Sequence, residues 1–199
     1  MIRLPTHDVR LSDERVHLRP FTEADFDIVA HWFDDPEVMY YSEGQENPHY
    51  SRAEIEGIYC DTAERGALLF IIETAEGKVI GETWLQSLNL ERLKKQPPDL
   101  AFRIDIMIGE KEYWDKRYGR HAVRLLLRHA FEALHADRVV GMSFEFNERS
   151  IRMFQACGLR PVRRVPDQVT RGQQKFADVD LEITREDWLQ SREALPLKW

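Results

Sequence analysis

The hydrophobic pattern changes its period within one short stretch of the chain, and this change limits the fold more than any other feature. Residues 101–109, "AFRIDIMIG", alternate at a period of two, so that Phe102, Ile104 and Ile106 share one face. This spacing is typical of a β-strand. Residues 123–134 instead place apolar side chains every three or four positions, which indicates an amphipathic helix. The sequence therefore predicts a strand, a turn and a helix that packs on the sheet.

The turn between this strand and this helix is basic, although the chain has 28 basic and 35 acidic residues. Lys116, Arg117 and Arg120 surround Gly119 at the start of the helix. A helix N-terminus already carries partial positive charge and unpaired N–H groups, so added cations oppose the helix unless an anion binds there. A glycine also allows a ligand to approach the backbone closely. The turn therefore predicts a pyrophosphate site, and a solvated basic helix face is the simpler alternative.

The remaining pattern alternates strands and helices without an internal repeat. Helices are expected after Thr22, Ser51 and Asn147, because these residues are good N-caps. Pro36 ends the helical pattern that follows Thr22. Residues 39–50 are expected to form a loop, and residues 167–175 a polar hairpin loop between the last two strands. The remaining strands are expected at residues 16–19, 67–74, 79–88, 137–144, 159–165 and 178–188, the last of which ends in a short helix or tail. The sequence therefore predicts an α/β (α+β) fold with a mixed sheet and helices on both faces.

Composition and charge bound the class of protein. The 199 residues are 43% hydrophobic and 32% charged, which predicts one domain spanning residues 1–199, with a core at about 14–184 and a C-terminal tail at 185–199. The net charge of −7 argues against nucleic acid and anionic membranes as partners and is compatible with a cationic substrate. Trp188 and Trp199 are expected to cover the core or a subunit contact, so a homodimer is compatible with the sequence.

The compartment is expected to be the cytoplasm. Cys60 and Cys157 are too few and too far apart to indicate a disulfide framework, which favours a reducing compartment. Residues 1–10 lack the pattern of a signal peptide, and the longest apolar run, residues 67–72, is too short to span a bilayer. The seven histidines show no spacing with cysteines or carboxylates that indicates a metal site, so none is predicted.

Three segments resemble the GCN5-related N-acetyltransferases (GNAT). "YWDKRYGRHA" resembles their acetyl-CoA turn, usually Gln/Arg-x-x-Gly-x-Gly/Ala, with Arg117 in place of the first glycine and Gly119 at the second. "NERSIRMFQACGLRPV" resembles their second motif, with Asn147 at its start and Phe154 in the place of the usual tyrosine. "VHLRPFTEADFDIVAHWF" resembles the first strand and helix of the ribosomal-protein, polyamine and aminoglycoside branches. The resemblance covers roughly residues 14 to 165.

The resemblance implies a GNAT-like, mostly antiparallel sheet of six to seven strands and acetyl-CoA as the cofactor. In the family, the strand before the turn separates from the next strand and binds the pantetheine arm through its backbone. The residues implied to bind acetyl-CoA here are Ile106, Met107, Ile108, Trp114, Lys116, Arg117, Tyr118, Gly119, Arg120, His121, Asn147, Ser150 and Phe154. The family's tyrosine is proposed to protonate the leaving thiolate, and Tyr113, Tyr118 and Cys157 are weaker candidates for that role.

The amine that accepts an acetyl group must lose a proton. A lysine-like amine has a pKa near 10.4, so only about one molecule in a few thousand is the free base at pH 7. Two carboxylates in strands, Asp105 and Glu82, are the candidate bases. Asp105 is preferred, because "RID" resembles the Arg-Gly-Ile-Asp stretch of aminoglycoside 6′-N-acetyltransferases. The alternative for Asp105 is a surface ion pair with Arg103 or a lysine on an edge strand, and the alternative for Glu82 is an exposed glutamate at a strand end.

Three functions are consistent with these motifs. The first is acetyl transfer from acetyl-CoA to a small cationic amine, such as an aminoglycoside-like or polyamine-like molecule. The second is the same transfer to the N-terminus of a protein, as in ribosomal-protein acetyltransferases. The third is an acyl-CoA-binding module without catalysis. Arg117 and Phe154 are consistent with this alternative, because both depart from the family motifs. The first function is expected, since the chain tolerates a cationic substrate.

Overall fold

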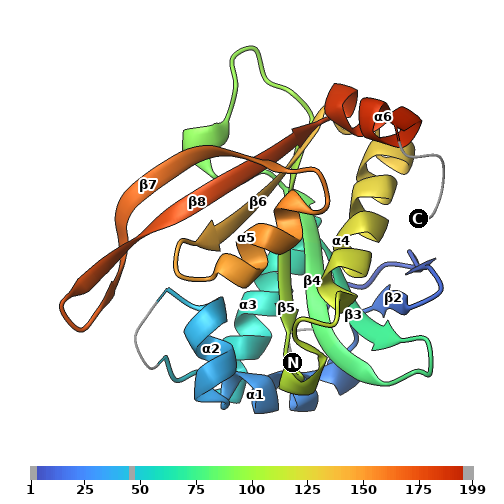
Figure 1. Cartoon of the computed structure of the whole chain (residues 1–199). Coiled ribbons are helices and arrows are strands. Elements are labelled where there is room, and N and C mark those ends of the chain that lie inside the picture. Colours follow the sequence, from blue (N-terminus) through green and yellow to red (C-terminus); the bar gives the residue numbers. More distant parts are fainter. Residues whose placement is uncertain (1–3, 45–47, 195–199) are drawn as a thin grey trace.

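A computed structural model describes residues 4–44 and 48–194, with the side chains of 192–194 left out. One sheet in the order β1-β2-β3-β4-β5-β6-β8-β7 forms its centre (Figure 1). All neighbouring strands are antiparallel except β5 and β6, which are parallel. The strands are β1 (Leu11–Ser12), β2 (Val16–Pro20), β3 (Leu68–Thr74), β4 (Val79–Ser87), β5 (Ala101–Ile108), β6 (Arg138–Phe144), β7 (Arg160–Arg171) and β8 (Gln174–Thr184).

The predicted fold class is confirmed, and the sheet in the described residues has eight strands where six to seven were expected. The additional strand, β1, is two residues long, too short for a hydrophobic period to be read from the sequence. Helices cover both faces of the sheet, as the alternating pattern indicated (Figure 1). The α-helices are α1 (Phe26–Phe33), α2 (Pro36–Ser42), α3 (Arg52–Glu64), α4 (Tyr118–Arg128), α5 (Glu148–Gln155) and α6 (Arg185–Ala194).

Each face of the sheet has its own hydrophobic core. Buried side chains of α1 and α3, among them Trp32 and Tyr59, pack on one face. Buried side chains of α4, α5 and α6 pack on the other, where Trp188 of α6 stacks on Phe131 at 5.1 Å between ring centroids. Trp188 therefore covers the core, which was one of the two roles expected of it. Trp199 lies outside the described residues.

Helix α2 corrects the loop expected from residue 39 onward. Pro36 ends the pattern of α1 and also occupies the first turn of α2. The carboxylate of Asp35 accepts hydrogen bonds from the N–H groups of Glu37, at 2.9 Å, and Val38, at 3.3 Å. An aspartate N-cap followed by proline is a strong start signal for a helix. The helix was missed because the proline was interpreted only as a break.

The last two strands are longer than the sequence predicted. Residues 167–175, expected as a loop, pair across the hairpin as far as Arg171 and Gln174, and the turn lies at Gly172 with φ of 58°. Strand β6 pairs with β8 only up to Phe144 and Asp178, so the end of the hairpin projects beyond the sheet (Figure 1). The end of the hairpin has a polar sequence, which is typical of a loop, because most of its side chains face solvent.

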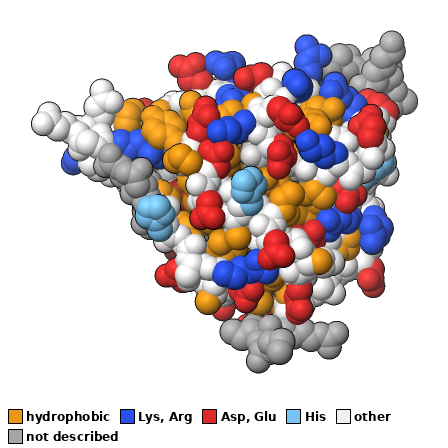
Figure 2. All heavy atoms as spheres, turned by 90° about the horizontal axis from the view of Figure 1, so that it is seen from below, with side chains coloured by type: hydrophobic (Ala, Val, Ile, Leu, Met, Phe, Trp, Pro, Cys, Tyr) orange, Lys and Arg blue, Asp and Glu red, His pale blue; other side chains and the backbone are white. Residues whose placement is uncertain are grey.

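No helix in the described part of the chain is long and apolar enough to cross a membrane. Acidic and basic side chains are interspersed on the face seen from below, with smaller groups of hydrophobic side chains between them (Figure 2). The net negative charge is therefore not gathered into one field on that face.

Candidate functional site

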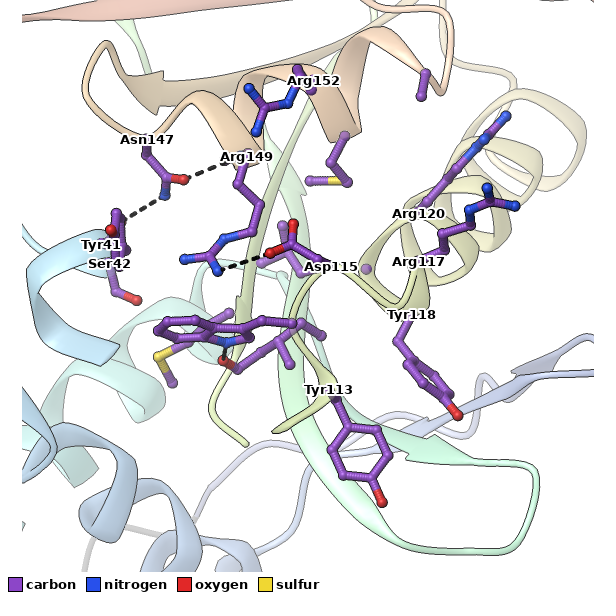
Figure 3. A pocket seen from close by; sticks show the side chains of 18 of the residues that line it. Tyr41, Ser42, Tyr113, Asp115, Arg117, Tyr118, Arg120, Asn147, Arg149 and Arg152 are labelled. Atoms are coloured by element: carbon purple, nitrogen blue, oxygen red, sulfur yellow. Dashed lines mark hydrogen bonds and ion pairs between the residues drawn. The ribbon is translucent and has the colours of Figure 1, made fainter. Parts of the chain in front are cut away.

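The parallel strands β5 and β6 separate halfway along their length. Their pairing begins at Ala101 and Arg138 and ends at Ile104 and Gly141, so the second half of β5 has no partner on that side. A cavity of about 580 Å³ lies beside this half of β5, between the start of α4, the start of α5 and the end of α2 (Figure 3). It is lined by Val38, Tyr41, Ser42, Ile106, Met107, Ile108, Tyr113, Trp114, Asp115, Arg117, Tyr118, Gly119, Arg120, Asn147, Arg149, Ser150, Arg152, Met153 and Ala156.

The turn before α4 has an uncommon backbone. Arg117, the residue before the helix, has φ of 70° and ψ of 5°, and Asp115 has φ of 58°. This left-handed region favours glycine, which explains why the family motif has glycine where this chain has Arg117. Gly119 lies outside that region. A Cβ atom added there would lie 3.6 Å from the side chain of Ile106, so the protein itself leaves room for a larger residue.

Four arginines line this cavity. Arg117 and Arg120 come from the start of α4, and Arg149 and Arg152 from the first turns of α5 (Figure 3). The Nε of Arg120 is buried and has no hydrogen-bond partner among the described residues. Two helix N-termini and four cations at one cavity make a suitable site for an anion with several phosphates.

Arg149 reaches from α5 toward the turn before α4. Its guanidinium lies 4.0 Å from the ring centroid of Trp114 and 4.8 Å from that of Tyr41, and it is 3.6 Å from the carboxylate of Asp115 (Figure 3). Trp114 is fixed in turn, because its Nε1 donates a hydrogen bond to the carbonyl oxygen of Ile108 at 2.7 Å. The stacked side chains therefore connect α2, β5, the turn and α5 around the cavity.

The structure brings most of the predicted cofactor-binding residues together at this cavity. The predicted residues that line it are Ile106, Met107, Ile108, Trp114, Arg117, Tyr118, Gly119, Arg120, Asn147 and Ser150. Lys116, His121 and Phe154 are not among its lining residues.

These three side chains point elsewhere for identifiable reasons. The Nζ of Lys116 lies over the ring of Tyr113, at 5.7 Å from its centroid. His121 is on the other side of α4, where its Nδ1 lies 2.7 Å from the carboxylate of Asp13. Phe154 is buried against Gly141, where an added Cβ would come within 2.7 Å of the ring. Lys116 precedes α4, and His121 and Phe154 face other directions on their helices, so adjacency in the motif did not place these side chains in the cavity.

Cys157 and Asn147 are both engaged by the protein. The Cys157 thiol is buried, which raises its pKa to about 12, and it lies 3.6 Å from the carbonyl oxygen of Arg120. Asn147 caps α5 by accepting a hydrogen bond from the N–H of Ser150 at 3.1 Å. Its Nδ2 donates to the carbonyl oxygen of Tyr41, also at 3.1 Å, so the amide joins α5 to α2 (Figure 3).

A second cavity of about 350 Å³ shares residues with the first. Tyr41, Ser42, Ile106, Met107, Asn147 and Ser150 line both, so the two cavities meet at β5. The other side chains of the second cavity are largely aromatic and acidic. They belong to Phe33, Glu43, Ile58, Glu82, Thr83, Trp84, Arg103, Asp105, Met142, Ser143, Phe144 and Phe154, and Gly44 completes the lining.

Glu82 is buried at this second cavity, so the alternative of an exposed glutamate at a strand end is wrong. Its Oε2 accepts a hydrogen bond of 2.5 Å from the hydroxyl of Tyr59 and one of 3.3 Å from the Nε1 of Trp84. Burial, with a smaller contribution from the nearby Asp105 carboxylate, raises the pKa of Glu82 to about 7 despite the lowering effect of these two donors. A carboxyl group with this pKa can accept a proton near neutral pH.

Asp105 also lines the second cavity but is engaged by neighbouring side chains. The guanidinium of Arg103 lies 2.8 Å from one carboxylate oxygen and donates to the other at 2.9 Å, and Gln86 donates to the latter at 2.6 Å. The alternative of an Asp105–Arg103 pair is therefore present, although β5 is an inner strand and not an edge. Asp105 is thus paired with a cation, whereas Glu82 is bonded by the neutral side chains of Tyr59 and Trp84.

Sequence reasoning missed several residues of the two cavities. Arg149 and Arg152 follow Asn147 at a helix start, so the excess of cations that marked the first turn could have marked this one as well. Tyr41 was interpreted as part of a loop, and Tyr59 falls in the helix expected after Ser51, where nothing marked it as a partner of Glu82. No sequence pattern distinguishes a tyrosine that bonds a distant carboxylate from one that only fills the core. Among residues 4–44 and 48–194, no group of three or more histidine, cysteine or acidic side chains could hold a metal ion.

Comparisons with known proteins identify related sequences and folds. A family model described as an acetyltransferase (GNAT) domain matches residues 15–160. An uncharacterised protein of Methanocaldococcus jannaschii is 26% identical over 161 residues, covering 76% of this chain and 29% of that protein. The FsC-acetyl coenzyme A-N(2)-transacetylase of Aspergillus fumigatus is 25% identical over 126 residues, covering 58% of this chain and 49% of that protein. The chain thus spans about half or less of the length of these relatives.

The fold is also similar to solved structures. A spermidine N-acetyltransferase of Vibrio cholerae, in complex with CoA and spermine, superposes with a TM-score of 0.73 and 16% sequence identity. The match covers 89% of this chain and 99% of that chain. The similarity in fold therefore covers most of this chain, although few residues are identical.

Proposed function

The chain belongs to the GNAT acetyltransferase family, and on this premise we propose that it transfers the acetyl group of acetyl-CoA to a primary amine of a small cationic molecule. The observation that carries the proposal is the meeting of two cavities at the free half of β5. One is lined by arginines and two helix N-termini, and the other contains a buried carboxyl group with a pKa of about 7.

The first cavity fits coenzyme A in its chemistry. Arg117, Arg120, Arg149 and Arg152 supply cations for phosphates, and the unpaired half of β5 offers backbone groups to an amide-containing arm. The protein leaves room beside Gly119, so the absence of a side chain there is better explained by the close approach of a ligand than by packing. These residues would hold the donor with its phosphates at α4 and α5 and its other end toward the second cavity.

The second cavity fits an amine acceptor. When bound, acetyl-CoA supplies an acetyl group activated as a thioester, whose carbonyl carbon bonds to the amine nitrogen as the thiolate leaves. Glu82 in its carboxylate form accepts the proton that the amine must lose, and Tyr59 and Trp84 hold Oε2 in place. Phe33, Trp84 and Phe144 provide aromatic walls for the body of the acceptor.

The position of the family's tyrosine supplies no acid in this proposal. Phe154 has no proton to donate, and the buried Cys157 thiol is held in the protein. A thiol like that of free cysteine has a pKa near 8.5, so its thiolate leaves without protonation at neutral pH. Acetyl transfer therefore needs the base but no acid from this position.

Free-thiol release from acetyl-CoA in the presence of a panel of amines tests the proposal. The panel contains polyamines, aminoglycosides, simple alkylamines and short peptides with free N-termini, and products are identified by mass spectrometry. We expect release that depends on a small amine, with one acetylated amine per thiol. Release with peptides alone would point to protein N-termini as acceptors. Binding of acetyl-CoA without release by any amine would contradict catalysis.

A further inference from the structure

The segment Tyr40–Gly44 at the end of α2 forms a wall of the second cavity, called the acceptor cavity below, and its last four residues line that cavity. Tyr41 and Ser42 line both cavities, whereas Glu43 and Gly44 line only the second one. The carboxyl group of Glu43 accepts a hydrogen bond from Tyr50 at 3.2 Å, and burial raises its pKa. The position of this segment therefore sets the shape of the acceptor cavity on the side of Glu43.

The backbone of this wall is held by side chains from the C-terminal half of the chain. The last carbonyl groups of a helix lack partners within the helix. Arg171 of β7 donates hydrogen bonds from Nη2 to the carbonyl oxygen of Tyr40, at 2.6 Å, and to that of Glu43, at 2.9 Å. Asn147 holds the carbonyl oxygen of Tyr41 between them. A guanidinium at a helix C-terminus is also favoured by the helix dipole.

Packing fixes the guanidinium of Arg171 in this position. It lies 4.1 Å from the ring centroid of Tyr40 and 4.7 Å from that of Phe146. Val169, two residues earlier on the same strand, is buried, and a Cβ added to Gly44 would lie 3.3 Å from its side chain. The projecting end of the β7–β8 hairpin is thus packed against the wall, which gives a role to the part of the hairpin that lies beyond the sheet.

Arg171 itself lines neither of the two cavities. Arg171 bonds the backbone of Glu43, which lines only the acceptor cavity. Asn147 bonds the backbone of Tyr41, which lines the donor cavity as well, and this bond does not depend on Arg171. Loss of Arg171 should therefore affect the acceptor side more than the donor side.

We propose that Arg171 is a positioning residue for the acceptor, holding the Tyr40–Gly44 wall through the carbonyl groups of Tyr40 and Glu43. The inference rests on the proposed function, because it assigns the second cavity to the amine. It implies that the hairpin determines how well an acceptor is bound without contacting the acceptor itself.

The variant Arg171→Ala tests this, with the best amine from the panel as acceptor. We expect the KM for the amine to rise on the order of tenfold, because two hydrogen bonds from a charged donor are lost. The dissociation constant of acetyl-CoA, measured by calorimetry, should stay within about twofold, since the donor cavity keeps all its lining residues. Arg171→Lys, which keeps a cationic donor, should recover part of the lost acceptor binding.

Arg164→Ala is the matched control. Arg164 is exposed on the same strand and pairs with Glu145, away from both cavities, so its loss should leave both constants unchanged. An unchanged KM for the amine in Arg171→Ala, or an equal weakening of amine and acetyl-CoA, would overturn the inference while leaving the proposed function intact. A wild-type protein that acetylates no amine would instead overturn the proposed function, and this inference with it.

Discussion

Glu82 is a buried residue that lines the acceptor cavity, and its environment decides whether it can act as a base. Its carboxyl group is buried, receives two hydrogen bonds at Oε2 and lies near Asp105, which is itself paired with Arg103. Burial alone would keep the group protonated at neutral pH, and the two donors bring its pKa back to about 7. Tyr59 and Trp84 therefore tune the group as well as orient it.

The variant Tyr59→Phe should shift the pH dependence of acetyl transfer. The Tyr59 hydroxyl lowers the pKa of Glu82, so its removal raises that pKa and moves the acidic limb of the kcat profile to higher pH. The expected shift is about one pH unit, since a hydrogen bond to a charged group is worth roughly 1.5 kcal/mol or more. Tyr50→Phe is the control, because its hydroxyl bonds Glu43 instead. A profile that moves equally in both variants would exclude this role for Tyr59.

Stability should also report the pKa of Glu82. Its folded-state pKa of about 7 is raised from the ordinary 4.5, so between these values the folded protein holds a proton that the unfolded chain has released. The free energy of unfolding therefore falls as pH rises through this range, by roughly 3 kcal/mol at most. Glu82→Gln has no titrating carboxyl group at this position, so its free energy of unfolding does not include this decrease.

Urea unfolding at pH 5 and pH 8 measures this effect. The stability of Glu82→Gln relative to the wild type should be higher at pH 8 than at pH 5, and the other titrating groups cancel in the comparison. A difference between the two proteins that does not change with pH would mean that Glu82 titrates normally.

Residue identity alone could not settle which carboxylate is the base. Asp105 and Glu82 both lie in apolar strands of the sequence, and the preference for Asp105 rested on a resemblance over three residues. The structure distinguishes them through side chains distant in the sequence, Tyr59 beside Glu82 and Gln86 beside Asp105. Such partners carry no local sequence signal.

At the scale of elements, the turn between β5 and α4 carries the largest departure from the family motif. Arg117 adopts a left-handed backbone, which costs a non-glycine residue roughly 1–2 kcal/mol. The same residue brings a cation to the donor cavity. Arginine in place of the family's glycine therefore lowers the stability of the turn and adds a positive charge at the proposed phosphate site.

Arg117→Gly should separate these two effects. We expect the free energy of unfolding to rise by about 1 kcal/mol, because glycine adopts this conformation readily and loses only part of that gain to its greater freedom when unfolded. The affinity for acetyl-CoA should fall a few-fold with the lost charge, as measured by calorimetry. Lys116→Ala, which changes a residue outside the cavity lining, should leave the affinity unaltered. Unchanged affinity in Arg117→Gly would show that Arg117 does not contribute to the binding of acetyl-CoA.

The elements themselves were largely predictable where the hydrophobic period was long and unbroken. The strand of residues 101–108 and the helix that begins at Tyr118 follow directly from their spacing. Helix α2 and the end of the β7–β8 hairpin did not, because α2 is short and begins at a proline, and the hairpin end carries mostly polar, exposed side chains. These two elements contact each other beside the acceptor cavity, at Tyr40–Gly44, so the acceptor side was the less predictable half of the site.

At the scale of the whole molecule, the separation of β5 from β6 creates the site. Pairing between the two strands stops at Ile104 and Gly141, and helices from both halves of the chain border the gap. The family resemblance implied this separation, whereas no hydrophobic pattern in β5 or β6 indicates where pairing stops. The structure places ten of the thirteen predicted cofactor-binding residues at one cavity, because the motifs lie on the two helices that flank the gap.

The most direct test of acetyl transfer with Glu82 as the base uses isotope-labelled acetyl-CoA and an amine, with the wild-type protein and Glu82→Gln compared and acetyl-CoA binding measured in parallel. We expect the wild type to form one labelled acetyl-amine for each thiol released. Glu82→Gln should bind acetyl-CoA as tightly but turn over about a hundredfold more slowly at neutral pH, the contribution of a positioned base. Turnover by Glu82→Gln at the wild-type rate would contradict this role of Glu82.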